Sequence, residues 1–360
     1  MQHERERRGR LSRAEHGWIR LAAAALSVTF LAAVCLSAKA DSGPSADPPL
    51  RKAAQVWRGT VLASDPSVVL RRSDLAMAYT DLDVATNRTV LALAVSNDGR
   101  RWRTEWNAQG VGGLVLAGRE GRWDENLESA ALLRTDRGWR LYYSGYPDEG
   151  RPVKGFPAAL GLAASGDGRT FVRSSDEPVL RPTPGWYDND AVYSPTLLHE
   201  RGAYTMIYVG HAYTDVSKIG AGGVYLLWAV SDDGVIWRKG EAPLAGPGSF
   251  GDWRRDGLAE PFLVRRGPGA YLLFYTGLRG EERALGVATA PTPTGPWDFG
   301  RRPILRPGPP GSADARQVLA PSVLLEGDLL RLWYLAVDSR GRLSVGYAEG
   351  SLQEVLAASR

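Results

Sequence analysis

The sequence predicts an all-β fold, a five-bladed β-propeller, and three observations support this prediction. A short motif recurs five times, at starts that lie 64, 65, 66 and 60 residues apart. A Tyr follows each start after 14 or 15 residues, at the end of an alternating apolar and polar stretch. Three of the units then reach an Ala-x-Ser sequence and an Asp-Gly turn. Repeats of tens of residues that hold several short strands, without helical periodicity, are typical of a propeller.

The recurring motif marks the first strand of each unit. It reads Asp65-Pro66-Ser67-Val68-Val69, Ser129-Ala130-Ala131-Leu132-Leu133, Ser194-Pro195-Thr196-Leu197-Leu198, Glu260-Pro261-Phe262-Leu263-Val264 and Ala320-Pro321-Ser322-Val323-Leu324. The second strand ends at the recurring Tyr residues, which are Tyr79, Tyr143, Tyr208, Tyr275 and Tyr334. The third strand runs into the turns Asp98-Gly99, Asp167-Gly168 and Asp233-Gly234. Because Asp-Gly supplies the positive φ values of a tight turn, strands three and four are expected to form a hairpin.

Four strands per unit and five units leave the last unit one strand short. Its fourth strand can come from Val56–Leu62, which resembles the fourth-strand stretch Ile236–Leu244. Pairing of this N-terminal strand into the last blade would close the ring. We therefore expect one propeller over residues 55–350, followed by a C-terminal tail at residues 351–360.

Residues 1–40 are typical of a signal peptide for export. This segment contains seven basic and three acidic residues, an apolar run over Leu21–Leu36, and the small residues of Ala38-Lys39-Ala40 that a signal peptidase needs. The run is short for a membrane span, which takes roughly 20 apolar residues. We expect cleavage after Ala40 and a secreted or periplasmic product. A lipoprotein signal at Cys35 and an uncleaved anchor are the alternatives.

Export would change the charge and chemistry of the chain. The formal net charge of +4 is the surplus of the first 40 residues, so the rest of the chain is neutral, and charge gives no argument for nucleic acid or an anionic membrane. Cleavage would also remove the single Cys and leave only His199 and His211, which excludes Cys/His zinc motifs and disfavours a Ser-His-Asp triad.

Residues 41–54 are a Pro- and Ser-rich linker. We expect a monomer without a stable membrane span after cleavage.

Function is expected where the blades differ, because features shared by most blades are explained by turns and packing. In a propeller the first strand of each blade lines the central channel. Its register position reads Asp65, Ser129, Ser194, Glu260 and Ala320. Carboxylates are costly to bury unless they are paired or hydrogen-bonded, and Asp is disfavoured in strands. A pair of channel carboxylates is the equipment of glycoside cleavage, in which one protonates the leaving oxygen and the other activates water or attacks. The structural alternative is that each accepts hydrogen bonds from backbone N–H groups at the channel end.

With these residues the chain resembles the five-bladed propeller glycosidases, above all glycoside hydrolase family 43, with families 32, 68, 117 and 130 as relatives. The resemblance covers residues 55–350. It implies an Asp base that opens blade one, matched by Asp65-Pro66, and a Glu acid that opens a later blade, best matched by Glu260-Pro261. Two departures stand out: Ser194 takes the place where family 43 usually has its acid, and Ser129-Ala130-Ala131 replaces the motif that holds a pKa-tuning Asp.

Further candidates lie four residues before the register position, in loops expected at the channel mouth. They are Glu125, Asp190 and Asp256, and Asp190 is the preferred replacement for the tuning Asp, as a third catalytic residue. The substrate-binding candidates are Glu125, Trp186, Asp188, Ser194, Asp256 and His211. Capping of the loop by Asp, and packing by the Trp residues, are the structural alternatives. The resemblance also implies a channel calcium ion with a histidine nearby, which gives His211 a possible second role; no other cofactor and no protein metal site is expected.

The leading hypothesis is an exported, inverting glycoside hydrolase with Asp65 as base and Glu260 as acid, acting on oligo- or polysaccharides. A non-catalytic propeller that binds glycans or a protein is the first alternative. A glycoside phosphorylase like family 130 is the second, and it would need basic residues beside the acid, for which Arg254, Arg255 and Arg279 are the nearest in sequence.

Overall fold

A computed structural model describes residues 49–53, 55–106, 112–147, 157–213 and 222–360. The predicted signal peptide at residues 1–40, and the linker up to residue 48, lie outside the described residues. Within the described part, none of the helices has the length and apolar character needed to cross a membrane.

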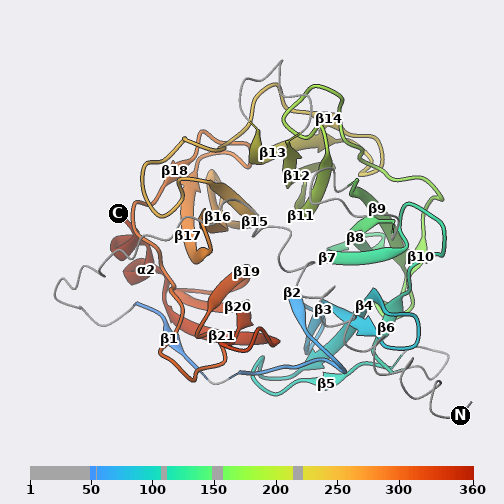
Figure 1. Cartoon of the computed structure of the whole chain (residues 1–360), viewed down its shortest axis with the longest axis horizontal. Helices are drawn as coiled ribbons and strands as arrows, with labels where there is room; N and C mark the ends of the chain where they lie inside the picture. Colours follow the sequence, from blue (N-terminus) through green and yellow to red (C-terminus); the bar gives the residue numbers. More distant parts are fainter. Residues whose placement is uncertain (1–48, 54, 107–111, 148–156, 214–221) are drawn as a thin grey trace, which may run out of the picture. The chain divides into compact units, whose positions relative to one another are not determined.

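The described chain folds into five antiparallel sheets, which confirms the predicted five-bladed β-propeller (Figure 1). Blade one contains β2 (Ser64–Leu70), β3 (Leu75–Asp83), β4 (Arg88–Ser96) and β5 (Arg103–Thr104), with β6 (Leu114–Leu116) paired to β4. Blade two contains β7 (Asn126–Thr135), β8 (Gly138–Tyr146), β9 (Ala159–Ser165) and β10 (Val172–Arg173). Blade three contains β11 (Ala191–Glu200), β12 (Ala203–Ala212), β13 (Gly223–Ser231) and β14 (Arg238–Lys239). Blade four contains β15 (Gly257–Gly267), β16 (Ala270–Arg279), β17 (Glu282–Ala290) and β18 (Asp298–Phe299). Blade five contains β19 (Gln317–Glu326), β20 (Leu329–Val337), β21 (Leu343–Ser351) and β1 (Arg51–Lys52).

The first strands of the five blades surround the central axis (Figure 1). Each of β2, β7, β11, β15 and β19 contacts the first strands on both sides, and β19 returns to β2. The hydrophobic core is divided into clusters between neighbouring blades, such as the one that joins Leu93 of blade one to Leu132 of blade two. This arrangement leaves the register positions of the first strands facing the channel.

Every first strand carries a β-bulge at the register position. Pairing with the second strand skips two residues in each blade, for example between Ser64 and Ser67 and between Ala259 and Phe262. The first bulged residue is left-handed in all five blades, with φ values of 50° at Asp65, 51° at Ser129, 47° at Ser194, 49° at Glu260 and 46° at Ala320. This backbone region costs a non-glycine residue about 1–2 kcal/mol. A bulge also explains the Pro that follows in four blades, because its missing N–H breaks no ladder hydrogen bond there.

The recurring Tyr residues have the packing role expected for them. All five are buried, and the hydroxyl groups of Tyr143, Tyr208 and Tyr334 each contact an Asp carboxylate. In three blades a Gly on the third strand lies under the ring; a Cβ atom on Gly161 would lie 2.2 Å from Cζ of Tyr143. The Asp-Gly turns are also as predicted, since Gly99, Gly168 and Gly234 have φ values of 71–74° and each turn leads into the short fourth strand.

The outer edge of blade five is formed by a segment from the front of the chain. Strand β1 pairs with β21, so residues 51 and 52, expected to be linker, belong to the sheet. Trp57, in the stretch predicted as a strand, forms an isolated bridge with Val345. Lys52 of β1 forms an ion pair of 2.6 Å with Asp314.

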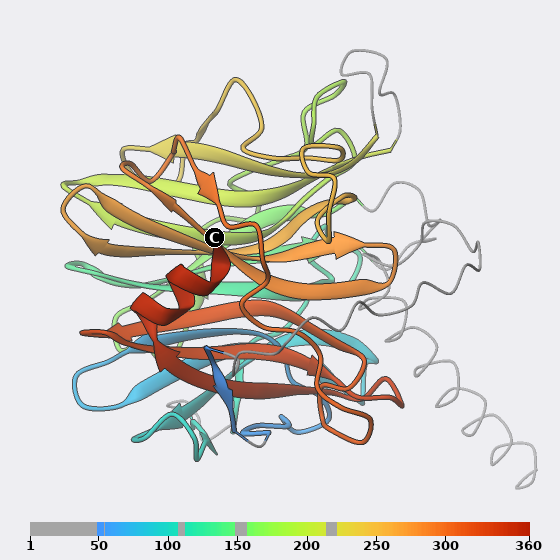
Figure 2. The same ribbon diagram turned by 90° about the vertical axis from the view of Figure 1, so that its left-hand side faces the viewer.

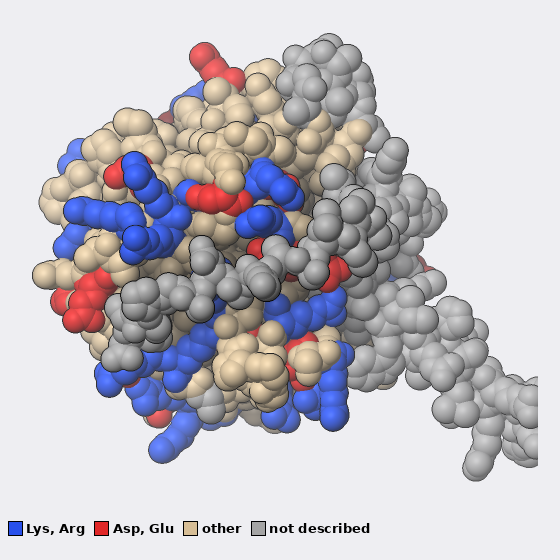
Figure 3. Space-filling model, turned by 60° about the vertical axis from the view of Figure 1, so that its left-hand side comes forward, with Lys and Arg blue, Asp and Glu red and all other residues tan. Residues whose placement is uncertain are grey.

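The expected C-terminal tail is a helix, α2 (Leu352–Ser359), which follows β21 directly. The hydroxyl of Ser351 accepts a hydrogen bond from the N–H of Glu354 and caps the first turn. Leu352 and Val355 are buried in the cluster between blades four and five, and the helix lies at the rim of these blades (Figure 2). On the face seen in Figure 3, Lys and Arg side chains stand in separate groups with acidic residues beside several of them.

Candidate active site

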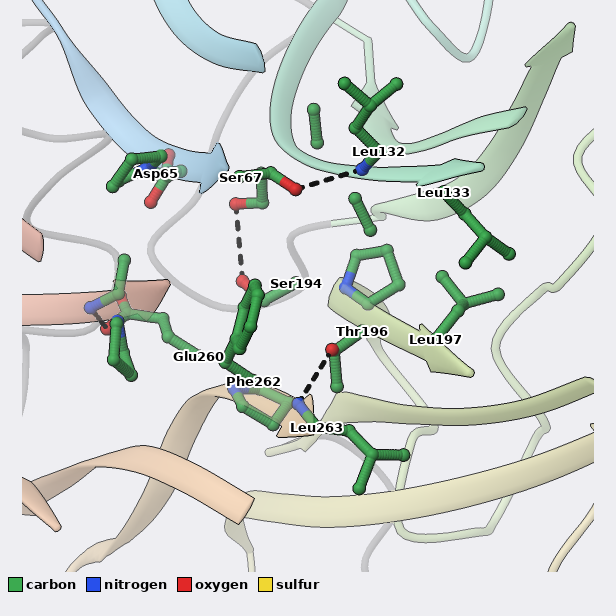
Figure 4. Close-up of a pocket in the computed structure, with 18 residues that line it drawn as sticks. Asp65, Ser67, Leu132, Leu133, Ser194, Thr196, Leu197, Glu260, Phe262 and Leu263 are labelled. Carbon is green, nitrogen blue, oxygen red and sulfur yellow. Dashed lines mark hydrogen bonds between the residues drawn. The ribbon is translucent and has the colours of Figure 1, made fainter. Parts of the chain in front are cut away.

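The five register positions line one cavity in the channel (Figure 4). The lining comes from the register position and the next residues of each first strand. Asp65 lies toward one side of the cavity, while Leu133 and Leu197 lie at the other. Asp65 and Glu260 are the only carboxylates among the described residues that line it. The structure therefore brings together the two residues predicted as base and acid, in a setting that is otherwise formed by hydroxyl and apolar side chains.

Asp65 is half-buried and held through one oxygen. Its Oδ2 accepts hydrogen bonds from the hydroxyls of Ser64, at 3.0 Å, and Thr80, at 3.3 Å. Burial raises the pKa of Asp65, and the hydrogen bonds from Ser64, Thr80 and Ser129 act against this increase. The burial effect is the larger, so the group is easier to protonate than an exposed Asp.

Glu260, the second carboxyl group of the cavity, is also held through one oxygen. Its Oε2 accepts hydrogen bonds from the hydroxyl of Thr276, at 2.6 Å, and the N–H of Ala320, at 2.9 Å. Burial and the negative charge of Asp65 raise the pKa of Glu260 to about 7, against the opposing effects of these hydrogen bonds and of the Arg283 charge. Glu260 is thus partly protonated at neutral pH, which a general acid requires.

Blade five separates blades four and one on the short way round the ring, and Ala320 is its register residue. Its small side chain stands between the two carboxylate-bearing blades. Ser129 and Ser194 occupy the longer way round, with their hydroxyl oxygens 3.3 Å apart. Ser194, which the sequence predicts to bind substrate, is one of the residues that line the cavity. Its N–H donates a hydrogen bond to the hydroxyl of Ser144.

Asp190 and His211 lie next to each other beyond the cavity lining. The carboxylate of Asp190, the third catalytic candidate, is buried and accepts a hydrogen bond from the N–H of Tyr213. The ring of His211 is 4.0 Å from that of Tyr213 and 6.4 Å from that of Tyr193. Burial lowers the pKa of His211 to about 4, although the charge of Asp190 works in the opposite direction. His211 is therefore neutral at physiological pH.

Tyr193 and Arg283 were missed by the sequence reasoning. Both lie close enough to Glu260 for its charge to affect them. The hydroxyl of Tyr193 has no hydrogen-bond partner among the described residues, whereas buried Arg283 donates to the carbonyl oxygens of Gly280 and Glu282. The available signal was the charge of Arg283 itself, which pairs with the third residue after the recurring Tyr. The equivalent residues in blades one, three and five are Thr89, Val224 and Leu343, which are uncharged.

Asp188, predicted to bind substrate, is not among the residues that line the cavity. Its carboxylate is fully buried, pairs with Lys239 and accepts a hydrogen bond of 3.1 Å from Tyr208. The pattern recurs in other blades: Asp124 pairs with Arg173, and Asp314 pairs with Lys52. A basic residue on the fourth strand, an Asp in the entry loop and the buried Tyr thus form a repeated structural unit.

The remaining candidates also stand outside the cavity lining. Glu125 is buried in an ion pair of 2.5 Å with Arg88, and half-buried Trp186 packs edge-on against Tyr187 with ring centroids 4.8 Å apart. Exposed Asp256 accepts hydrogen bonds from the N–H of Gly280 and the side chain of Arg255. Glu125 and Trp186 thus have contacts within the protein, and their predicted roles in substrate binding stay predictions. Asp256 is close enough to Arg283 for their charges to interact.

The basic residues suggested for a phosphorylase are not the ones beside the acid. Arg254 is buried, pairs with Asp252 and lies over the ring of Phe250. Arg283 instead carries the positive charge near Glu260. For the channel calcium, the described residues contain no group of three or more His, Cys, Asp or Glu side chains arranged to hold a metal ion. The expected ligand set is therefore not found in the described channel.

Comparisons with known proteins agree with the fold. No family model and no curated protein matches the sequence. Among solved structures, the chain is similar to an N-acetylgalactosamine deacetylase from F. plautii in complex with blood group B trisaccharide (19% identity, 86% of this chain and 98% of that one, TM-score 0.64). It is also similar to a β-1,2-mannobiose phosphorylase from Listeria innocua (13% identity, 88% and 95%, TM-score 0.63) and to a thermostable family-43 glycoside hydrolase (15% identity, 82% and 91%, TM-score 0.58). Likeness at these identities establishes a shared propeller fold.

Proposed function

We propose that the chain is a glycoside hydrolase in which Glu260 is the general acid and Asp65 the general base. One observation carries this proposal: the two carboxylates of the cavity face it from different blades, and burial together with the charge of Asp65 raises the pKa of Glu260 to about 7. Two titratable groups whose environments separate their protonation states are the signature of an acid and a base. The similarity of the fold to glycan-active enzymes supports the substrate class.

The chemistry follows from these protonation states. Protonated Glu260 donates its proton to the glycosidic oxygen as the bond to the anomeric carbon breaks. Ionised Asp65 takes a proton from a water molecule, whose oxygen bonds to the anomeric carbon from the opposite face, and the configuration inverts. Both carboxyl groups then return to their starting states by proton exchange with solvent.

The wall beside Glu260 supplies candidate contacts for a sugar. Ser194 lines the cavity, and the phenol of the preceding residue, Tyr193, is close enough to Glu260 for the charge of Glu260 to affect it. Hydroxyl groups can both donate to and accept from sugar hydroxyls. We assign substrate binding to these two residues, with neutral His211 packed behind Tyr193.

The proposal is tested by incubating the purified chain with a panel of oligosaccharides and measuring the products and their anomeric configuration. Asp65→Asn and Glu260→Gln should each lower hydrolysis by roughly 10²–10⁴-fold. Glu349→Gln, which removes a peripheral ion pair with Arg100, is the control and should leave the rate unchanged. Unaltered hydrolysis in both channel variants would contradict the assignment.

A phosphorylase is the second candidate, because Arg283 places a positive charge near the acid. A phosphate ion in place of water would need such a cation. The chain would be a phosphorylase and not a hydrolase if glycan cleavage depends on inorganic phosphate and is lost in Arg283→Met. If neither water nor phosphate supports cleavage but sugars bind equally to wild type, Asp65→Asn and Glu260→Gln, the propeller is a binding protein.

Export is part of the proposal and rests on residues 1–40. Expression of the full chain in a secreting bacterial host should give a mature N-terminus at Asp41, measured by mass spectrometry of the intact protein. An unprocessed N-terminus would remove the support for a secreted or periplasmic enzyme.

A further inference from the structure

The residue after the recurring Tyr differs between blades in the same way as the register position. It is Thr80 in blade one, Ser144 in blade two, Val209 in blade three, Thr276 in blade four and Leu335 in blade five. Threonine thus stands only in the two blades whose first strand carries a carboxylate. Thr80 and Thr276 are almost fully buried, and a buried hydroxyl without a partner is costly.

The Thr276 hydroxyl has both of its hydrogen-bonding roles assigned by its neighbours. It accepts the N–H of Ala320 at 3.1 Å, so its own proton points to Oε2 of Glu260 at 2.6 Å. The same N–H also approaches Oε2 at 2.9 Å. One oxygen of Glu260 therefore receives two donors, while no described residue donates to Oε1.

Blade one repeats this arrangement. The hydroxyl of Thr80 accepts the N–H of Ser129 at 3.2 Å and donates to Oδ2 of Asp65 at 3.3 Å. Ser144 of blade two likewise accepts the N–H of Ser194, at 3.0 Å, but its blade has no carboxylate. The link to the next blade is therefore a structural feature, and donation to a carboxylate is an addition found in blades one and four.

We propose that Thr276 is a positioning residue that holds Oε2 of Glu260 and so leaves Oε1 as the oxygen that carries and delivers the proton, with Thr80 in the equivalent role for Asp65. This proposal rests on the proposed function for its chemical meaning. An oxygen that already accepts two hydrogen bonds is a poor site for a proton, because protonation there would face two donors. Oε1 accepts no hydrogen bond from a described residue and is therefore the oxygen left to carry the proton to a glycosidic oxygen.

The test measures the ionisation of Glu260 without any substrate. The chain is labelled with ¹³C at the side-chain carboxyl of Glu, the Glu260 resonance is assigned with Glu260→Gln, and its chemical shift is followed from pH 4 to 9. A hydrogen bond to a charged carboxylate stabilises its ionised form. In the Thr276→Val variant, which lacks this bond, Glu260 should therefore bind its proton on the order of tenfold more tightly than in wild type. Thr276→Ser keeps the hydroxyl and should titrate like wild type.

Two controls separate positioning from structural effects. Ser144→Ala removes the equivalent link between blades without touching a carboxylate and should leave the Glu260 titration unchanged. Val already occupies this position in blade three, as Val209, so the substitution suits the strand; Thr276→Ala is the second hydroxyl-free variant if Thr276→Val does not fold.

The proposal is overturned if the folded Thr276→Val or Thr276→Ala variant titrates Glu260 as wild type does, or if Ser144→Ala shifts it equally. The proposal is supported if Thr276→Val shifts the Glu260 titration and Thr276→Ser titrates like wild type. If that result is obtained but no glycan is cleaved, the proposed function fails while the positioning role of Thr276 stands. Where hydrolysis is found, the alkaline limb of the pH–rate profile should move upward in Thr276→Val and return in Thr276→Ser.

Discussion

Burial and the negative charge of Asp65 raise the pKa of Glu260 to about 7, although the two residues belong to blades one and four. The charges of Asp65 and Glu260 interact because the closed ring of blades brings their first strands to the same channel. Only blade five lies between these two blades on the short side of the ring. Its register residue is Ala320, whose side chain is small and whose N–H donates a hydrogen bond to Glu260. Two buried carboxyl groups whose charges interact titrate as a pair, with one group favoured to stay protonated.

The raised pKa predicts how stability depends on pH. Native Glu260 binds its proton more tightly than the unfolded chain, whose Glu has a pKa near 4.5, so the stability it contributes is present at low pH and is lost as pH rises from about 4.5 to about 7. Glu260→Gln removes the buried charge. It should match wild type at pH 4.5 and be more stable at pH 8, by on the order of 2 kcal/mol, in urea unfolding at both pH values. A variant less stable than wild type at pH 8 would contradict the burial of this charge.

Gly161 is predicted to be required for packing beneath Tyr143. A Cβ atom there would lie 2.2 Å from the ring, which cannot move without displacing neighbouring strands. Gly161→Ala should lower the free energy of unfolding by on the order of 2 kcal/mol or more. Gly166→Ala is the matched control, because open space surrounds its Cβ position, and it should change stability by less than about 0.5 kcal/mol. Thermal unfolding of both variants checks the difference.

The fold could be predicted because its signals repeat. The register motif, the buried Tyr and the Asp-Gly turn recur at nearly constant spacing, so each blade supports the assignment of the others. The short β1 and the helix α2 occur once each and lack that support. Two-residue strands are also too short for any periodicity to reveal.

The candidate site could be predicted only in part, for the same reason. Asp65 and Glu260 could be placed at the channel because a repeat fixed the register of the first strand. The ion pair of Asp188 with Lys239 could not be predicted, because Lys239 lies 51 residues further along the chain and the sequence does not show which way a loop Asp points. Thr80 and Thr276 carried a readable signal, since they follow the recurring Tyr in just the two carboxylate blades. That signal becomes visible when two strands of a repeat are compared together.

His211 is predicted to stay neutral through the physiological range. Burial lowers its pKa to about 4, so the stability that its neutral form contributes is present above pH 6.5 and is lost as pH falls toward about 4. The imidazole ¹H resonance of His211, assigned with His211→Gln, should stay constant from pH 8 down to about pH 5.5. A midpoint near 6.5 would show that the ring is solvated, and the packing against Tyr193 and Tyr213 would then be wrong.

Asp188 and Lys239 are predicted to serve stability rather than sugar binding. The carboxylate is fully buried, so Lys239→Met leaves its charge unpaired beside Tyr208. Breaking a buried ion pair from one side costs about 3–5 kcal/mol, whereas exposed pairs contribute about 0–1 kcal/mol. Lys239→Met should therefore unfold at much lower urea concentration than wild type, while the control Arg238→Met, which removes the exposed pair with Asp232, should not. Below its unfolding transition, Lys239→Met should bind or cleave the same sugars as wild type. A selective loss of sugar binding in a stable Lys239→Met protein would contradict this and would support the role in substrate binding that the sequence predicts for Asp188.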